Sequence, residues 1–435
     1  MDLLFKNITA VTMDGASSLL TNVDLGIQGR KITYIAPTGD ATATRVIDGT
    51  NKALMPGLYN CHTHAAMTLF RGYANDRALE DWLFNYIFPA ERKLTAKLTR
   101  TGTMLAIAEM IASGTIAFSD MYFFMDEVAR AADEAGVLAN VSNAVIGFEK
   151  DSYSFYKDNV YGQTITAMEE FHKKGDGRIK IDASIHGVYT SYAPAWKQVM
   201  DFAAANELAL HIHLSETKTE HENCIKEYGM TPTQVFNQHG LFEFPTLAAH
   251  GVWVSDEDIK ILAEKNVHVS HNPMSNLKLA SGLAPVDKML KQGVNVALGT
   301  DGMAANNSHD LFEEIKMASL LQKYTLNDPT AAPAKDVLAM ATTGGAKAQG
   351  RDHESGKLAV GYDADLLMID FDNVRQTACY DPVLNLAYST TGRDVEMTIC
   401  RGKVLYEKGE YKTIDIEKLL HEARQAMHIF TGDNI

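Results

Sequence analysis

Residues 54–64 read LMPGLYNCHTH, an apolar run that ends in two histidines two positions apart. Successive side chains of a β-strand point to opposite faces, so residues two apart point the same way. His62 and His64 are therefore expected to project together from the C-terminal end of one strand. In a (β/α)8 barrel the active site lies at that end of the strands. The stretch thus predicts both a barrel strand and the first part of a site.

The same kind of short apolar run recurs through the middle of the chain. The candidate strands are 54–59, 115–119, 137–141, 179–185, 208–214, 246–249, 266–270 and 294–298. Longer segments of helical pattern separate them, at 101–113, 125–135, 194–206, 256–265, 283–292 and 310–323. Alternating strands and helices predict a parallel sheet. Eight such units favour a closed (β/α)8 barrel of the TIM type over an open sheet.

The two ends of the chain have a different texture, with short apolar runs punctuated by glycine. These runs are 3–5, 32–35, 45–48, 357–361, 365–370 and 397–405. The pattern is typical of short antiparallel strands. We therefore expect one small β domain, built from 1–54 with 356–435 and closed by a helix near 415–428. The catalytic barrel would occupy 55–355.

Composition excludes several classes of protein. The formal net charge is −15, from 55 acidic and 40 basic residues, which disfavours a nucleic-acid partner. The four cysteines form no CxxC pair, so a zinc knuckle is not expected. We expect reduced thiols in a cytoplasmic protein. We expect no signal peptide and, since no apolar run reaches about 18 residues, no membrane span.

Histidine or aspartate lies at the ends of six of the eight candidate strands. These residues are His62, His64, His186, His213, His250, His271 and Asp301. Imidazole and carboxylate ligands suit Zn²⁺ or Fe²⁺, and three His with one Asp leave a position open for water. A bound metal lowers the pKa of that water to about 7. Glu216, three residues after His213, could enter the same cleft and move a proton. His211 is expected to fill the barrel.

The sequence favours one bound metal over two. Barrels of this type that hold two metals usually need a bridging group, often a lysine near the end of the fourth strand. The only lysine of residues 180–186 is Lys180, at the start of that strand, which favours a single metal.

Other catalytic motifs are absent from the sequence. The chain has no GxxxxGK[ST] phosphate loop, no HExxH and no H-x-E…P-C-x-x-C signature.

The sequence resembles the amidohydrolase superfamily and, within it, the methylthioadenosine/S-adenosylhomocysteine deaminase group. The segments that carry the resemblance are MPGLYNCHTHAAMT (55–68), HLSET (213–217), AHG (249–251), SHNPMSNLKL (270–279) and GTDG (299–302). The resemblance implies a TIM-type barrel with a small β-sandwich domain. It also implies one divalent metal, Zn²⁺ with Fe²⁺ as the alternative. The implied ligands are His62, His64, His213 and Asp301.

The resemblance also implies a reaction, the hydrolytic deamination of an adenosine-type nucleoside with release of ammonia. Glu216 would protonate a ring nitrogen, His250 would orient the water, and Asp301 would accept the proton of that water.

The implied partner is a small amino-purine nucleoside. Three residues would bind it: Glu80 through the ribose hydroxyls, Trp82 by packing on the ligand, and His186 by contact with the nucleoside. A homodimer or higher homo-oligomer would also fit the group.

The sequence departs from the deaminase group in two places. Members that bind the homocysteine carboxylate use arginines after the third strand, but residues 140–177 contain no arginine. The group often has serine four positions after the metal-binding aspartate, and here that residue is Ala305. These differences leave methylthioadenosine, adenosine and another amino-heterocycle open as substrates alongside S-adenosylhomocysteine.

Two other functions remain open from the sequence. One keeps the site and changes the substrate to guanine, a pterin, cytosine or an s-triazine, by deamination or dechlorination. The other is a metal-free scaffold on the same fold, against which the intact set of candidate ligands argues.

Overall fold

The computed structural model describes residues 1–15, 18–77, 79–150 and 152–431. The chain divides into two compact units. The first unit comprises Met1–Asn60, Ala108–Ala117 and Asp310–Ile414. The second comprises Cys61–Ile107, Phe118–His309 and Asp415–Ile435.

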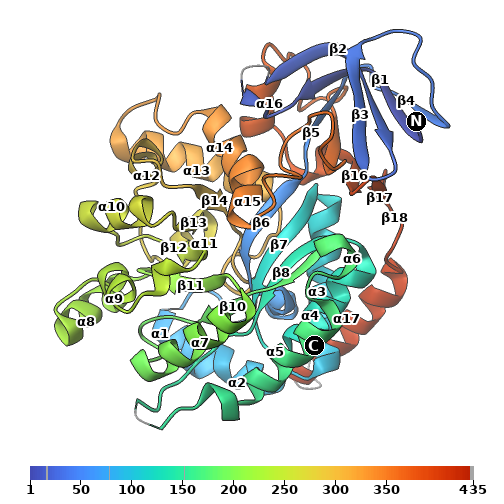
Figure 1. Cartoon of the computed structure of the whole chain (residues 1–435). Coiled ribbons are helices and arrows are strands. Elements are labelled where there is room, and N and C mark those ends of the chain that lie inside the picture. Colours follow the sequence, from blue (N-terminus) through green and yellow to red (C-terminus); the bar gives the residue numbers. More distant parts are fainter. Residues whose placement is uncertain (16–17, 78, 151, 432–435) are drawn as a thin grey trace. The chain divides into compact units, whose positions relative to one another are not determined.

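One mixed sheet brings strands from both ends of the chain together. Among the described residues it contains β1 (Leu3–Val11), β2 (Leu19–Gln28), β3 (Lys31–Pro37), β4 (Arg45–Asp48), β5 (Lys52–Pro56), β15 (Leu366–Asp370), β16 (Val395–Cys400), β17 (Lys403–Glu407) and β18 (Glu410–Tyr411). The N-terminal strands β1, β2 and β3 lie side by side (Figure 1). The two ends meet where β5 pairs with β15 antiparallel and with β1 in parallel.

The sheet differs from the antiparallel one expected from the sequence, because β1 pairs in parallel with both β4 and β5. The expected strand at 357–361 does not form, since this segment is a coil that ends in a turn. The hydrophobic core of the sheet nevertheless joins both ends of the chain, because Leu3 and Phe5 are buried in one cluster with Leu366 and Met368.

The middle of the chain forms two parallel sheets. One contains β6 (Leu58–Thr63), β7 (Thr115–Met121), β8 (Leu138–Ser142) and β9 (Ile179–Ile181). The other contains β10 (Ala183–Ile185), β11 (Leu210–Leu214), β12 (Thr246–His250), β13 (His268–His271) and β14 (Val296–Leu298). The pairs β8–β9, β10–β11, β11–β12, β12–β13 and β13–β14 are all parallel. Their C-terminal ends carry the candidate site.

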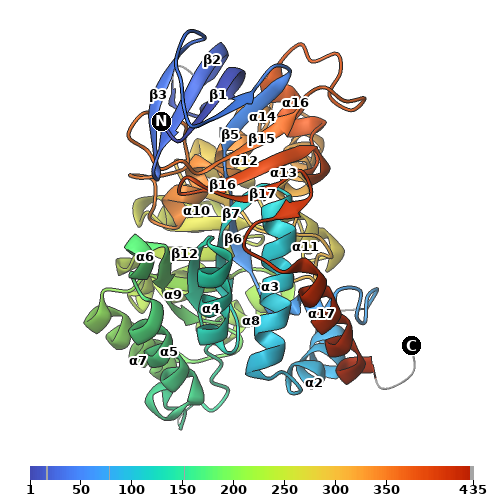
Figure 2. The same ribbon diagram turned by 90° about the vertical axis from the view of Figure 1, so that its right-hand side faces the viewer.

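Helices follow many of the strands in both units. They are α1 (Leu79–Trp82), α2 (Phe88–Glu91), α3 (Ala96–Ala112), α4 (Met125–Ala135), α5 (Asn159–Phe171), α6 (Lys174–Gly177), α7 (Ala193–Asn206), α8 (Lys218–Tyr228), α9 (Pro232–Gln238), α10 (Asp256–Glu264), α11 (Pro273–Lys278), α12 (Val286–Lys291), α13 (Leu311–Leu326), α14 (Ala334–Ala341), α15 (Thr343–Ala348), α16 (Pro382–Tyr388) and α17 (Ile416–Thr431). Within the second unit α4 packs against α5 (Figure 2). Across the described ranges, no helix is long and apolar enough to cross a membrane.

Two predicted strands need correction. The run 54–59 is divided at Pro56-Gly57, so β5 ends before β6 begins. Proline lacks an N–H for the ladder, and a Cβ on Gly57 would lie 2.4 Å from Cγ1 of Ile116. As a result His62 lies inside β6 rather than after a strand that begins at Leu54. The run 179–185 is likewise divided, because β9 pairs with β8 and β10 pairs with β11.

Each of the other six runs overlaps a strand, and the predicted helices form, most of them with shifted ends. The segment 125–135 coincides with α4, whereas 101–113 belongs to the longer α3 and 283–292 shortens to α12. The C-terminal helix α17 also forms.

Candidate active site

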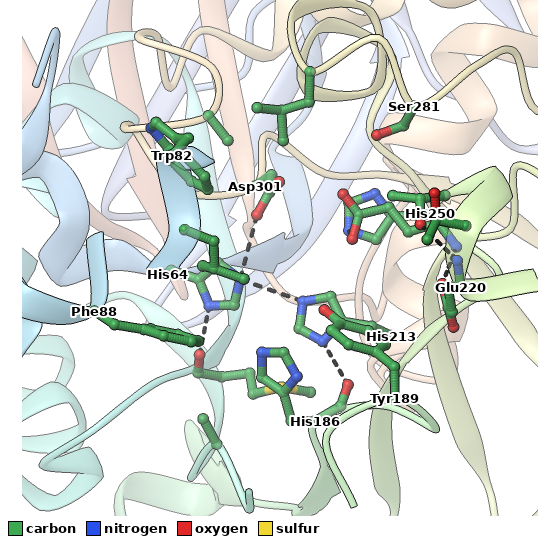
Figure 3. Close-up of a pocket in the computed structure, with 18 of the residues that line it drawn as sticks. His64, Trp82, Phe88, His186, Tyr189, His213, Glu220, His250, Ser281 and Asp301 are labelled. Carbon is green, nitrogen blue, oxygen red and sulfur yellow. Dashed lines mark hydrogen bonds and ion pairs between the residues drawn. The ribbon is translucent and has the colours of Figure 1, made fainter. Parts of the chain in front are cut away.

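Three imidazoles and one carboxylate converge at the C-terminal ends of β6, β11 and β14. Oδ1 of Asp301 lies 3.5 Å from Nε2 of His62 and 3.3 Å from Nε2 of His64. Nε2 of His213 lies 3.4 Å from Nε2 of His64. Figure 3 shows His64, His213 and Asp301 pointing toward one another. The four residues that the sequence predicted as metal ligands therefore lie together.

The opposite nitrogens of these imidazoles are held by hydrogen bonds. Nδ1 of His64 lies 2.6 Å from the carbonyl oxygen of Met121, and Nδ1 of His213 lies 2.7 Å from that of His186. A carbonyl oxygen only accepts, so both Nδ1 atoms carry the proton and both Nε2 atoms offer a lone pair. This arrangement is the usual one for histidine ligands of a metal.

His62 is the third imidazole of the set. Its Nδ1 lies 3.0 Å from Nε2 of His211, and its Nε2 is buried without a hydrogen-bond partner within the described chain. Burial lowers the pKa of His62 to about 4 and that of His213 well below its ordinary value, so both are neutral at neutral pH. Neutral imidazoles and a carboxylate are ligands that suit Zn²⁺, so this donor set could hold a divalent metal.

Glu216 and His250 lie beside this set. Oε2 of Glu216 is 3.8 Å from Nε2 of His250. Nδ1 of His250 lies 2.8 Å from Oδ1 of Asn276, which only accepts, so Nδ1 carries the proton and Nε2 faces the cleft. Burial raises the pKa of Glu216, which favours a protonated carboxyl group. A proton donor and an oriented imidazole therefore lie next to the candidate metal ligands.

The backbone at this edge is unusual in three places. Ser215, His250 and Asp301 have φ angles of +48°, +76° and +61°. Non-glycine residues rarely adopt this left-handed region, and such residues are concentrated at functional sites. At these three residues the chain turns at or just after the ends of β11, β12 and β14.

A cavity of about 780 Å³ opens over these residues within the second unit. This volume suits a molecule the size of a nucleoside. Polar groups of the candidate site line one part of it. The rest is largely apolar, with Met67, Trp82, Leu83, Phe84, Phe88, Phe123, Ile146 and Leu279.

Two of the three predicted substrate-binding residues line the cavity. The buried Trp82 and the half-buried His186 both line the cavity. Figure 3 shows them on different sides of His64. Nδ1 of His186 lies 3.0 Å from Oγ1 of Thr190, which fixes the ring. The backbone of Glu80 belongs to α1, but its side chain lies outside the described residues.

Sequence reasoning missed several residues that support the site. Ser275 and Asn276 lie on α11 and contact Asp301 and His250. The segment 270–279 that contains them carried part of the family resemblance, yet no role followed from it. His211 is buried as expected, but it also contacts a candidate ligand, so it does more than fill space.

Two carboxylates near the site were also missed. Oδ1 of Asp120 accepts hydrogen bonds from Oγ1 of Thr63 (2.8 Å) and from the amide of Ala65 (2.6 Å), the two residues that flank His64. Glu220 lines the cavity and is buried. No spacing rule singles out either residue, because the hydrogen bonds of each depend on how the folded chain brings its partners near.

Parallel strands whose C-terminal ends carry three histidines and an aspartate are typical of one class of metal-dependent hydrolases. Residues 53–405 match the amidohydrolase family, so the chain belongs to this family, and the resemblance seen in the sequence is confirmed.

Two relatives are similar over nearly their whole length. A 5-methylthioadenosine/S-adenosylhomocysteine deaminase of Thermoanaerobacter pseudethanolicus is 43% identical over 426 residues, which cover 98% of each chain. A 5'-deoxyadenosine deaminase of Methanococcoides burtonii is 43% identical over 428 residues, covering 98% of this chain and 97% of the relative.

Among solved structures, an adenosine deaminase from Xanthomonas campestris with bound zinc superposes with a TM-score of 0.93. It is 31% identical, and the match covers 99% of this chain and 98% of that one.

Proposed function

We propose that this chain is a hydrolytic deaminase of adenosine-type nucleosides, among them 5'-methylthioadenosine and adenosine, that releases ammonia and the inosine analogue. The observation that carries the proposal is the position of Glu216 and His250 beside the imidazole–carboxylate set, under a cavity of nucleoside size. The relatives named as deaminases of adenosine derivatives support the same reaction.

We assign one divalent metal to His62, His64, His213 and Asp301, with Zn²⁺ preferred and Fe²⁺ as the alternative. The zinc in the Xanthomonas campestris structure supports this choice. Such an ion supplies the nucleophile by lowering the pKa of a water molecule to about 7.

The side chains around the water then have separate tasks. Glu216 donates its proton to a ring nitrogen of the purine, which makes the amine-bearing carbon more electrophilic. Nε2 of His250 is held toward the cleft by Asn276 and orients the water. Asp301 accepts a proton from the water as the new C–O bond forms. That proton passes to the amino group, the C–N bond breaks as ammonia leaves, and the proton of the remaining hydroxyl group returns to Glu216, which gives the oxo form of the product.

The nucleoside would be bound in the apolar part of the cavity. In this proposal Glu80 binds the ribose hydroxyls, Trp82 packs on the ligand and His186 contacts the nucleoside. Among the described residues that line the cavity, Lys218 is the only lysine or arginine, and its side chain is 62% exposed. A substrate without a carboxylate therefore fits better than S-adenosylhomocysteine.

We also propose that the parallel strands close into a (β/α)8 barrel and that the mixed sheet forms a small β-sandwich domain. A hydrogen bond of 2.9 Å from the amide of Asp301, just after β14, to the carbonyl of His62 in β6 supports closure. The division into 1–54 with 356–435 and 55–355 is part of this proposal. A cytoplasmic location and a homo-oligomeric state stay predictions from the sequence.

The direct test is ammonia release from zinc-loaded protein, with the absorbance change from an adenine to a hypoxanthine ring. The panel comprises 5'-methylthioadenosine, 5'-deoxyadenosine, adenosine and S-adenosylhomocysteine. Guanine, a pterin, cytosine and an s-triazine are included as the alternative substrates. Turnover of a bare base but of no nucleoside would overturn the proposal, and the absence of any stoichiometric metal would favour a scaffold.

A further inference from the structure

Glu220 holds the backbone that presents Glu216. Glu220 lies in the first turn of α8 and is only 5% exposed. Its Oε1 accepts the amide N–H of Ser215 at 3.2 Å, and its Oε2 accepts the amide N–H of Glu216 at 2.7 Å. One carboxylate thus binds two consecutive backbone amides, and the second of them belongs to the proposed proton donor. Figure 3 shows Glu220 on the His250 side of the cavity.

The backbone between β11 and α8 is strained at this point. Ser215 has a φ of +48°, a left-handed conformation that is unfavourable for a non-glycine residue. Its carbonyl oxygen accepts the amides of Val252 (3.1 Å) and Trp253 (2.9 Å), so one side of the turn is fixed by the segment after β12. The carboxylate of Glu220 fixes the other side through the N–H groups.

The helix itself does not require this carboxylate for its N-terminal cap. Oγ1 of Thr217 accepts the amide N–H of Glu220 at 3.0 Å and caps α8. The side chain of Glu220 reaches past that cap to residues outside the helix. Burial, and then the nearby carboxylate of Glu216, raise the pKa of Glu220 to about 7. A buried carboxylate of this kind is unfavourable for stability unless its hydrogen bonds compensate for the lost solvation.

We propose that Glu220 is a positioning residue that fixes the carboxyl group of Glu216 against the substrate ring. The inference rests on the proton-donor role proposed for Glu216. Hydrogen bonds from amides to a carboxylate are short and directional, so together they define the path of the chain at Glu216. Displacing a reacting group by about 1 Å can lower a rate by about 100-fold.

The test compares Glu220→Gln with Glu220→Asp and with Glu222→Gln in zinc-loaded protein. Glutamine has the same shape but turns one acceptor into a donor that faces an N–H. Aspartate keeps both acceptors on a shorter side chain. Glu222 is the matched control, because it lies on the same helix and pairs only with the exposed Lys218 among the described contacts, at 3.5 Å.

We expect Glu220→Gln to lower kcat for 5'-methylthioadenosine by about 10- to 100-fold with KM changed by less than about threefold. Glu220→Asp should recover part of that loss, and Glu222→Gln should retain wild-type kcat. Bound zinc and the folded fraction are measured for each variant. A kcat within about threefold of wild type overturns the inference, and so does a loss that merely follows the fall in bound zinc or folded protein.

A double-mutant cycle gives an independent readout. If Glu220 acts through Glu216, Glu220→Gln should have little further effect in a Glu216→Gln background. Equal losses in both backgrounds would show a merely structural role and would overturn the inference. If wild-type protein turns over no adenosine nucleoside, the proposed function fails first, so the two failures are distinguishable.

Discussion

The hydroxyl group of Ser275 donates a hydrogen bond of 2.6 Å to Oδ2 of Asp301. The other oxygen of this carboxylate, Oδ1, faces the imidazoles of His62 and His64. The next residue along the chain, Asn276, accepts from His250. Two consecutive residues of α11 thus contact Asp301, to which we assign the acceptance of the water's proton, and His250, to which we assign the orientation of the water.

Replacement of Ser275 by alanine should loosen Asp301 without removing a metal ligand. We expect zinc affinity or kcat/KM to fall by about 10- to 100-fold, the range typical of groups that orient metal ligands. Zinc titration and steady-state kinetics measure the two effects. Ser275→Thr keeps the hydroxyl group and should lie closer to wild type. Equal losses in the alanine and threonine variants would show that packing, not the hydrogen bond, is responsible.

Replacement of Asn276 by alanine should act on His250 instead. Without Oδ1 of Asn276 the imidazole loses the acceptor that fixes the proton on Nδ1. We expect kcat to fall by at least about tenfold, while stoichiometric zinc is retained because His250 is not one of the proposed ligands. Metal analysis and kcat decide the question. A variant that loses zinc in proportion to activity would contradict this division of roles.

Periodic rules predicted a set of seven residues at strand ends that contains the candidate ligands, and the resemblance to the amidohydrolase superfamily then implied which four bind the metal. A period of two predicts that His62 and His64 share a face, and strand ends predict that His213 and Asp301 reach the same edge. The groups that orient them follow no such rule. Ser275 contacts the side chain of Asp301, 26 positions away, and Glu220 contacts the backbone amide of Glu216, 4 positions away. Only the folded loops bring these partners together.

The fold, too, could be predicted from the sequence only in part. The alternation of apolar runs and helices predicts the parallel strands, and α4 coincides with its predicted range. The division between β5 and β6 was not predicted, because an apolar run of six residues does not reveal that its two halves pair with different strands. Pro56-Gly57 was the local signal, and its meaning depends on the close approach of Ile116.

Removal of the metal should abolish activity and lower stability. A ligand that binds only the folded protein stabilises it by about 4 kcal/mol at a concentration 1,000 times its Kd. Chelation should therefore lower the Tm, and added Zn²⁺ should restore both Tm and ammonia release. His213→Ala should show the low Tm with or without Zn²⁺. Full activity in chelated protein shown to be metal-free would refute the metal-dependent mechanism.

Glu91 should make stability depend on pH. It lines the cavity and accepts a hydrogen bond of 2.7 Å from the hydroxyl of Tyr122. Burial raises the pKa of Glu91 from an ordinary 4.5 to about 7, against the opposing effect of that hydrogen bond. The folded protein thus binds this proton more tightly than the unfolded chain does. The associated stability is full below about pH 4.5 and is lost as the pH rises through 7.

Glutamine at position 91 keeps an acceptor for Tyr122 and removes the titration. We expect the free energy of unfolding of Glu91→Gln, relative to wild type, to increase by about 1–3 kcal/mol between pH 5 and pH 8. Denaturant titrations of both proteins at the two pH values measure this difference. A difference that stays constant, or that shrinks toward pH 8, would contradict the assigned direction of the pKa.

The apolar wall of the cavity should discriminate against a charged substituent on the 5' side of the nucleoside. Ala144, Ile146 and Ala305 line the cavity, and a carboxylate bound there would lose solvation without an arginine to compensate for it. We expect kcat/KM for 5'-methylthioadenosine to exceed that for S-adenosylhomocysteine by at least about tenfold, since one missing charged hydrogen bond is worth about 1.5–3 kcal/mol.

A gain-of-function variant separates charge from size. Ile146→Arg introduces a cation at the cavity wall and should raise kcat/KM for S-adenosylhomocysteine relative to 5'-methylthioadenosine. Ile146→Gln has a polar side chain without the charge and should leave the ratio near the wild-type value. An uncharged S-alkyl thioadenosine as long as homocysteine provides the control for length. If wild type uses this analogue as poorly as S-adenosylhomocysteine, cavity length and not the missing cation sets the preference, and the charge argument is wrong.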